Sequence, residues 1–336
     1  MKHLPVLLFF PLIMVLHQAS AQKTDSIYSL EKVQLGGIPQ TILTTGTDSS
    51  KPVLLILHGG PGYTEMALFR IFNRALDKDY VVVHWDQRGA AASYDPSIPE
   101  SSMNIDQFVS DAHELVTLLK QRFKKNKIFL LGHSWGTSLG LLLVQRYPQD
   151  FTAYIGVGQI VNMMDNERIS LQYTIQMASK THDTTAMREL STIAHRYPAK
   201  NDTSLNDLYL QRKWLSYFGG AVRGHRDYSY IFSRIKPGDP LFNEKQVEAG
   251  EAFSMRTLWK QLLNIDFLTT APVLKVPVYF LTGRYDYNTP FALVEKYYNQ
   301  VKAPAKKLIW FENSAHIPQF EEAARFNAVM KEIAQR

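Results

Sequence analysis

The chain has 336 residues, a formal net charge of +6, 45% hydrophobic residues and no cysteine. The lack of cysteine excludes disulfides, thiolate metal sites and cysteine catalysis. Basic residues are interspersed with acidic ones, so the positive charge is typical of a solvated surface and does not predict nucleic-acid binding.

The beginning of the chain has the pattern of an export signal. Lys2 precedes the apolar run Leu4 to Leu16, and Ala19-Ser20-Ala21 follows it. A basic start, a short apolar run and small residues at the cut are the parts of a secretory signal peptide. We expect residues 1–21 to be removed and the protein to be periplasmic or secreted, without stable membrane association after cleavage. An uncleaved membrane anchor is the alternative.

The next segment predicts a hairpin at a sheet edge and then a buried strand. Two β-like stretches lie within residues 33–45, around a Gly-Gly pair. Residues 52–57 are a continuous apolar run, which is typical of a parallel strand buried on both faces. Residues 58–62 read His-Gly-Gly-Pro-Gly. Because glycine lets the backbone approach a ligand closely, this loop is expected to present an unpaired amide, that of Gly60.

Helix and strand patterns then alternate. Residues 66–76 predict a helix, residues 80–85 a buried strand, and residues 105–123 a long amphipathic helix. An Asp-Gln-Arg-Gly sequence follows the strand. We interpret Asp86 and Arg88 as a structural brace between loops, with a catalytic role as the alternative.

The centre of the chain predicts a nucleophile elbow. Residues 127–131 read as a short buried strand, residues 132–136 are Gly-His-Ser-Trp-Gly, and residues 137–147 have the pattern of a buried helix. A strand, a G-x-S-x-G turn and a helix project the serine above the sheet edge. Ser134 is therefore the predicted nucleophile. The amides of Trp135 and Gly60 are the predicted oxyanion hole.

Residues 151–157 predict another strand, and the alternation implies a mainly parallel, three-layer α/β sheet. Residues 161–268 show helical patterns without a strand-like run, broken by polar loops near 200–204 and 237–240. After this segment the alternation of strands and helices resumes, with predicted strands at 276–281 and 307–311 and predicted helices at 291–301 and 320–333. We therefore predict a catalytic domain from residues 22–160 and 269–336, with a helical cap domain, 161–268, inserted after the sixth strand.

Two late loops complete the predicted catalytic set. A serine nucleophile needs a histidine base and an acid that orients the histidine. In this fold their order is serine, acid, histidine, and both partners follow late strands. Asp286 follows the strand 276–281 and His316 follows the strand 307–311, so they are the predicted acid and base. His58 also lies on a loop after a strand, but it precedes Ser134 and is expected to shape its own loop.

These motifs resemble the proline iminopeptidase (prolyl aminopeptidase) family of α/β-hydrolases. The resemblance rests on residues 58–62, 86–89, 132–136, 283–286 and 315–316, in order along the chain. It implies an α/β-hydrolase fold and a serine peptidase that removes an N-terminal residue, often proline, from small peptides. It also implies no cofactor and no metal. The family's Trp-rich cap segment corresponds to residues 213–220, which makes Trp214 a candidate substrate contact, although the acid of that motif is missing here.

The cap decides the substrate. An aminopeptidase must pair the substrate ammonium group with a carboxylate, because a buried unpaired charge is costly. Residues 161–168 lie closest to Ser134 along the chain and contain Asp165 and Glu167. Glu167 is the predicted anchor, and a helix-capping role for these acids is the alternative. An esterase with the same catalytic residues and a non-catalytic binding protein remain the alternative functions.

Overall fold

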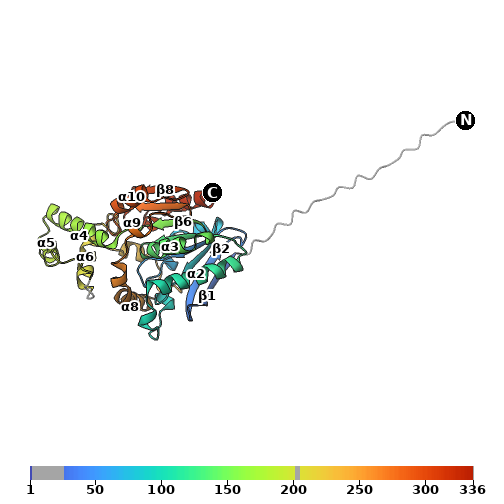
Figure 1. Cartoon of the computed structure of the whole chain (residues 1–336), viewed down its shortest axis with the longest axis horizontal. Helices are drawn as coiled ribbons and strands as arrows, with labels where there is room; N and C mark the ends of the chain where they lie inside the picture. The colour runs from blue at the N-terminus through green and yellow to red at the C-terminus, as the bar shows by residue number, and fades with distance from the viewer. Residues whose placement is uncertain (2–25, 201–204, 336) are drawn as a thin grey trace.

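The computed structural model describes Met1, residues 26–200 and residues 205–335. The predicted signal peptide beyond Met1, and positions 201–204 of the predicted polar loop, lie outside the described residues. Within the described part, eight strands form one sheet in the order β1-β2-β4-β3-β5-β6-β7-β8 (Figure 1). The strands are β1 (Ile27–Leu35), β2 (Ile38–Gly46), β3 (Val53–Leu57), β4 (Val81–Trp85), β5 (Ile128–His133), β6 (Phe151–Val157), β7 (Val278–Gly283) and β8 (Lys306–Phe311).

The sheet is antiparallel at one edge and parallel elsewhere. β1 pairs with β2 as a hairpin, with Leu35 opposite Ile38, and β2 pairs antiparallel with β4. Every other pairing is parallel. The predicted edge hairpin and the mainly parallel α/β sheet are therefore confirmed. Parallel pairing also brings the carboxyl ends of β3, β5, β6, β7 and β8 to one edge of the sheet.

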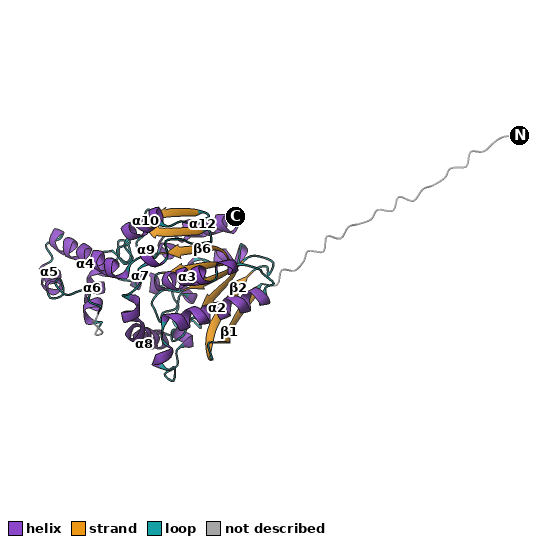
Figure 2. Ribbon diagram, viewed as in Figure 1, coloured by secondary structure: helices purple, strands orange, loops and turns teal. Residues whose placement is uncertain are grey.

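Helices cover both faces of the sheet (Figure 2). The flanking helices are α1 (Met66–Phe72), α2 (Ile105–Arg122), α3 (Trp135–Arg146), α10 (Phe291–Gln300), α11 (Pro318–Glu321) and α12 (Ala323–Ala334). Alternate residues of a strand point to opposite faces. In β3, Val53, Leu55 and Leu57 join a core with α2 and α3, whereas Leu54 and Ile56 join a second core with α1 and α12. Burial on both faces explains why this strand is apolar throughout.

Between β6 and β7 the described residues form helices and no strand. They are α4 (Met163–Lys180), α5 (Thr184–Ser191), α6 (Asn206–Tyr217), α7 (Ser229–Phe232), α8 (Glu244–Leu262) and α9 (Phe267–Thr270). α4, α5 and α6 lie to one side of the sheet, at the left of Figure 1. The ends of this helical segment pair with each other, because Met163 N donates to Ile265 O at 3.0 Å and Phe267 N donates to Val161 O at 2.8 Å. Their folding as a separate cap domain stays a prediction.

The last helical pattern is interrupted where the sequence predicted one helix. Glu322 separates α11 from α12 with a non-helical backbone, φ −123° and ψ 50°. Its carboxylate accepts hydrogen bonds from Asn313 N and Ser314 Oγ, so the break binds the loop that precedes His316. In the described residues, no helix has the length and apolar character needed to cross a bilayer.

Candidate active site

The elbow is a tight turn with an unusual backbone at Ser134, where φ is 51° and ψ is −119°. Such positive φ values are rare outside glycine, and they occur at nucleophile elbows. A Cβ on Gly132 would lie 2.4 Å from Gly136 O, and a Cβ on Gly136 would lie 2.1 Å from Leu57 O. The two glycines are therefore required by close packing of the turn on itself and on β3.

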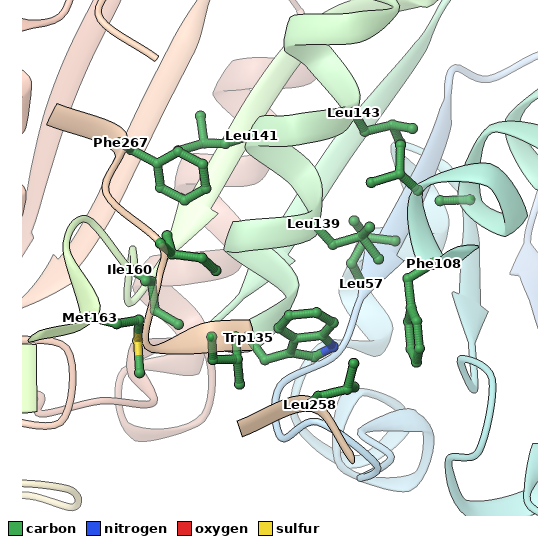
Figure 3. Packing of buried hydrophobic residues seen from close by; sticks show 14 of the residues in the cluster. Leu57, Phe108, Trp135, Leu139, Leu141, Leu143, Ile160, Met163, Leu258 and Phe267 are labelled. Carbon is green, nitrogen blue, oxygen red and sulfur yellow. The ribbon is translucent and has the colours of Figure 1, made fainter. Parts of the chain in front are cut away.

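Apolar side chains pack around Trp135 and support the elbow. Figure 3 shows Trp135, the first residue of α3, among Leu57, Phe108 and Leu258. The Phe108 and Trp135 rings meet edge to face, with centroids 5.7 Å apart. Leu258 comes from α8, so the elbow and that helix share one core.

A cavity of about 410 Å³ opens above the elbow. This volume lies in the range of small-molecule sites. Ser134, Trp135, Gly60 and His316 line it from the sheet side, and residues of α4, α6 and α8 line it from the other side. The structure thus brings the predicted nucleophile, base and oxyanion amides to one cavity.

Asp286 and His316 are in direct contact. His316 Nδ1 lies 3.0 Å from Asp286 Oδ2, and both side chains are buried. Asp286 Oδ1 accepts from the amides of Asn288 and Thr289 at 2.9 and 2.8 Å, and Oδ2 accepts from Thr289 Oγ1 at 2.8 Å. An anion with this many donors keeps the proton of neutral His316 on Nδ1, which leaves the lone pair on Nε2.

The last residue of β6 and the glycine that follows it pack against Ser134 and His316. Ser134 N donates to Val157 O at 3.0 Å. A Cβ on the next residue, Gly158, would lie 3.0 Å from two atoms of the His316 ring. Burial lowers the pKa of His316 below its ordinary value, although the nearby Asp286 carboxylate opposes this effect. The imidazole therefore stays neutral, and able to accept a proton, at lower pH than an ordinary histidine would.

The amides predicted as the oxyanion hole are free within the described part of the chain. Neither Gly60 N nor Trp135 N has a hydrogen-bond partner there. Gln87 ties the two loops together, since its side chain accepts from Trp135 Nε1 at 2.8 Å and donates to His58 O at 3.3 Å.

His58 and Arg88 have structural contacts. His58 Nε2 accepts from Gln87 N at 3.1 Å, and its Nδ1 lies 2.6 Å from Gly59 O. Burial lowers the pKa of His58 to about 4, so it is neutral. Arg88 forms a two-point ion pair with buried Asp111, at 2.8 and 3.1 Å. Arg88 is thus a brace, as predicted, but its partner is Asp111 on α2 and not the neighbouring loop acid.

Glu167 lines the cavity, but its charge is already compensated. Oε1 accepts from Arg212 Nη2 at 2.6 Å and from Asn166 Nδ2 at 3.1 Å, and Oε2 accepts from Tyr197 OH. The side chain is completely buried. Asp165, the other acid considered, pairs with Arg168 near the surface. The carboxylate predicted to anchor the substrate amine therefore joins α4 to α6.

Trp214 lies outside the cavity lining, which corrects the prediction that it contacts substrate. Helix α6 faces the cavity through Leu208, Tyr209, Arg212 and Ser216. Trp214 is two residues from Arg212 and is rotated by about 200° around the helix. Its Nε1 donates instead to Glu189 at 2.9 Å.

Glu251 on α8 is a cavity residue that the sequence did not single out. It lines the cavity and is solvent-accessible, and its carboxyl has no charged or hydrogen-bonding partner among the described residues. The concave surroundings partly desolvate this carboxyl and raise its pKa. Burial raises the pKa of the Tyr63 and Tyr228 hydroxyls, which also line the cavity, and the charge of Glu251 adds a smaller effect in the same direction. Helix α8 carries several acidic residues, and the sequence pattern does not indicate which of them faces the cavity.

Metal-binding geometry is not found in the described residues. No group of three or more His, Cys, Asp or Glu side chains there is arranged to hold a metal ion.

Comparison with known proteins identifies the family. The family model described as serine aminopeptidase, S33, matches residues 48–323. The probable aminopeptidase YbaC of Bacillus subtilis is 32% identical over 303 residues, which cover 90% of this chain and 94% of that protein. A proline iminopeptidase of Heyndrickxia coagulans is 25% identical over 287 residues, covering 82% of this chain and 88% of the relative.

A solved structure shares the fold. The proline iminopeptidase of Mycobacterium smegmatis superposes with a TM-score of 0.66 at 19% identity, covering 91% of this chain and 98% of that one. The α/β-hydrolase fold predicted from the sequence is thus confirmed, as is the resemblance to proline iminopeptidases. The chain is a serine hydrolase and belongs to the S33 serine aminopeptidase family.

Proposed function

We propose that the protein is an aminopeptidase that releases N-terminal residues from small peptides through a Ser134-His316-Asp286 triad. The common position of Ser134 and His316 in one cavity and the contact of His316 with Asp286 support this assignment. Membership of the family supports peptide hydrolysis, and the geometry of this chain supports the choice of these three residues.

In the proposed reaction, His316 Nε2 removes the proton from Ser134 as its Oγ attacks the carbonyl carbon of the first peptide bond. The amides of Gly60 and Trp135 donate to the developing oxyanion. His316 then gives the proton to the leaving amine, and an acyl-enzyme remains on Ser134. A water molecule, deprotonated by His316, releases the N-terminal residue by the same steps in reverse order.

The unpaired carboxylate of Glu251 is the observation that favours a peptidase over an esterase. An anion in a partly desolvated cavity is costly unless a cation meets it. The α-ammonium group of a peptide supplies such a cation, with a charge-assisted hydrogen bond. A neutral acyl ester has no cation to pair with Glu251. We therefore assign Glu251, and not Glu167, as the anchor of the substrate amine.

The wild-type protein tests this function. We expect it to cleave prolyl, alanyl or leucyl arylamides and to lose most of that activity when the amine is acetylated, because the acetylated substrate carries no cation for Glu251. Turnover should be insensitive to EDTA and abolished by a fluorophosphonate. A protein that cleaves short acyl esters but none of the free aminoacyl arylamides would be an esterase.

A further inference from the structure

The histidine of the elbow contacts the proposed base, His316. His133 is the residue before Ser134, and its two ring nitrogens have different partners. Nδ1 lies 2.6 Å from Glu65 Oε1, and Nε2 lies 3.1 Å from the backbone carbonyl oxygen of His316. Glu65 and His133 are both 4% exposed, and His316 is 3% exposed. The pair joins the loop after β3, the end of β5 and the loop after β8.

The hydrogen bonds place two protons on this pair. A carbonyl oxygen can only accept, so Nε2 of His133 carries a proton. The short contact at Nδ1 then holds a second proton between His133 and the Glu65 carboxylate. Burial opposes the ionised form of both groups, but each charge stabilises the other, which raises the pKa of His133 and lowers that of Glu65. The ionised state is an imidazolium beside a carboxylate.

The positive end of this pair faces the proposed base. The His133 and His316 ring centroids are 5.0 Å apart. Glu65 bonds the Nδ1 side of His133, whereas the Nε2 side is directed at His316. A cation at that distance disfavours a second cation on His316.

We propose that Glu65 and His133 are positioning residues, which fix the backbone of His316 by a hydrogen bond and keep its imidazole neutral in mildly acidic solution by charge. The inference rests on the proposed role of His316.

Other charged and titratable groups also act on these side chains. Those that act on His316 or lie around it are Asp286, Arg212, Glu321 and Tyr228, and those around the pair are His58 and His84. Asp286 favours the protonated form of His316, and Arg212 opposes it. Arg212 is itself neutralised by Glu167. Of Arg212 and His133, His133 is the group whose ring lies against the His316 ring.

The decisive variant is Glu65→Gln. Its amide can donate to Nδ1 of a neutral His133, which still donates from Nε2 to the His316 carbonyl, so both hydrogen bonds remain while both charges disappear. Without the cation, His316 becomes easier to protonate. We expect the acidic limb of the pH profile, normalised to its own plateau, to move upward by about half a pH unit or more. His133→Gln, which also lacks the cation, should move the limb in the same direction if Glu65→Gln folds poorly.

The readout should be the rate at which a fluorophosphonate labels Ser134 as a function of pH, because it needs no substrate amine. Glu312→Gln is the matched control, since Glu312 is an exposed acid paired with Arg284 and should leave the limb in place. An unlabelled wild-type protein would reject the proposed function. Normal labelling with an unshifted limb in both Glu65→Gln and His133→Gln would reject only the role of this pair.

Discussion

Glu167 on α4 and Glu251 on α8 line the same cavity, and their surroundings are opposite. Glu167 is completely buried and receives hydrogen bonds from Arg212, Asn166 and Tyr197. Glu251 is accessible and has no partner among the described residues. A compensated carboxylate holds a fold together, whereas an uncompensated one is available to a ligand. Proximity to the nucleophile along the chain therefore does not identify a substrate anchor.

Glu251 can select a substrate only if the cavity contains a reacting serine. Removing that serine should therefore have the largest effect. Ser134→Ala and His316→Ala should each lower kcat by about 10⁴-fold, and the double variant should be little worse, because the two residues act as a unit. Steady-state kinetics on an arylamide measures this. Near wild-type turnover by folded Ser134→Ala would show that Ser134 is not the nucleophile and that the reaction takes place elsewhere.

Gly60 tests whether the same cavity stabilises the transition state. Its φ is +117°, and an added Cβ would lie 3.0 Å from Gly62 N and from Tyr63 N. Gly60→Val should displace the amide and cost about 3 kcal/mol of transition-state stabilisation, seen as a fall in kcat. A loss confined to KM would mean that this loop binds substrate without contacting the oxyanion.

The two carboxylates should differ in their effects on stability. Glu167→Ala leaves Arg212 without its partner and should lower the free energy of unfolding by about 3 kcal/mol. Glu251→Gln is the matched control and should not lower it, because the folded state raises the pKa of Glu251 and its charged form therefore disfavours folding at neutral pH. Urea unfolding of both variants measures the difference. Equal losses would contradict the contrast.

The pH profile should separate the proposed base from the anchor. Protonated His316 cannot accept the serine proton, so kcat/KM falls as pH drops through its pKa. Because burial lowers that pKa, the acidic limb for an uncharged ester should lie below the ordinary histidine value of about 6.5. An aminoacyl arylamide should show a steeper limb, since Glu251 is also protonated as pH falls. Identical limbs for both substrates would exclude Glu251 from binding.

Residues at the sheet edge were predictable because strand ends locate them. Ser134, Asp286 and His316 each follow an apolar strand, and the parallel sheet brings those ends together. The contacts between loops were less predictable. Thr289, which bonds Asp286, has no signal in the sequence beyond its short distance along the chain.

In the helical segment between β6 and β7, the residues that line the cavity were not predictable, for a different reason. The face of a helix that meets a cavity depends on how helices pack, and a mixed polar pattern does not fix that rotation. The sequence pattern therefore does not show that Trp214 lies away from the cavity or that Glu251 lines it. The pairing of Glu167 with Arg212 joins residues 45 positions apart, which no local pattern reports.

The most direct measurement compares an alanyl arylamide with its des-amino counterpart, a propionyl arylamide, in the wild type, Glu251→Gln and Glu167→Gln. The wild type should prefer the charged substrate by tenfold or more in KM, because only the alanyl ammonium pairs with Glu251. Glu251→Gln should lose this preference, and folded Glu167→Gln should keep it. Loss of the preference in Glu167→Gln but not in Glu251→Gln would contradict the assignment of Glu251 as the amine anchor.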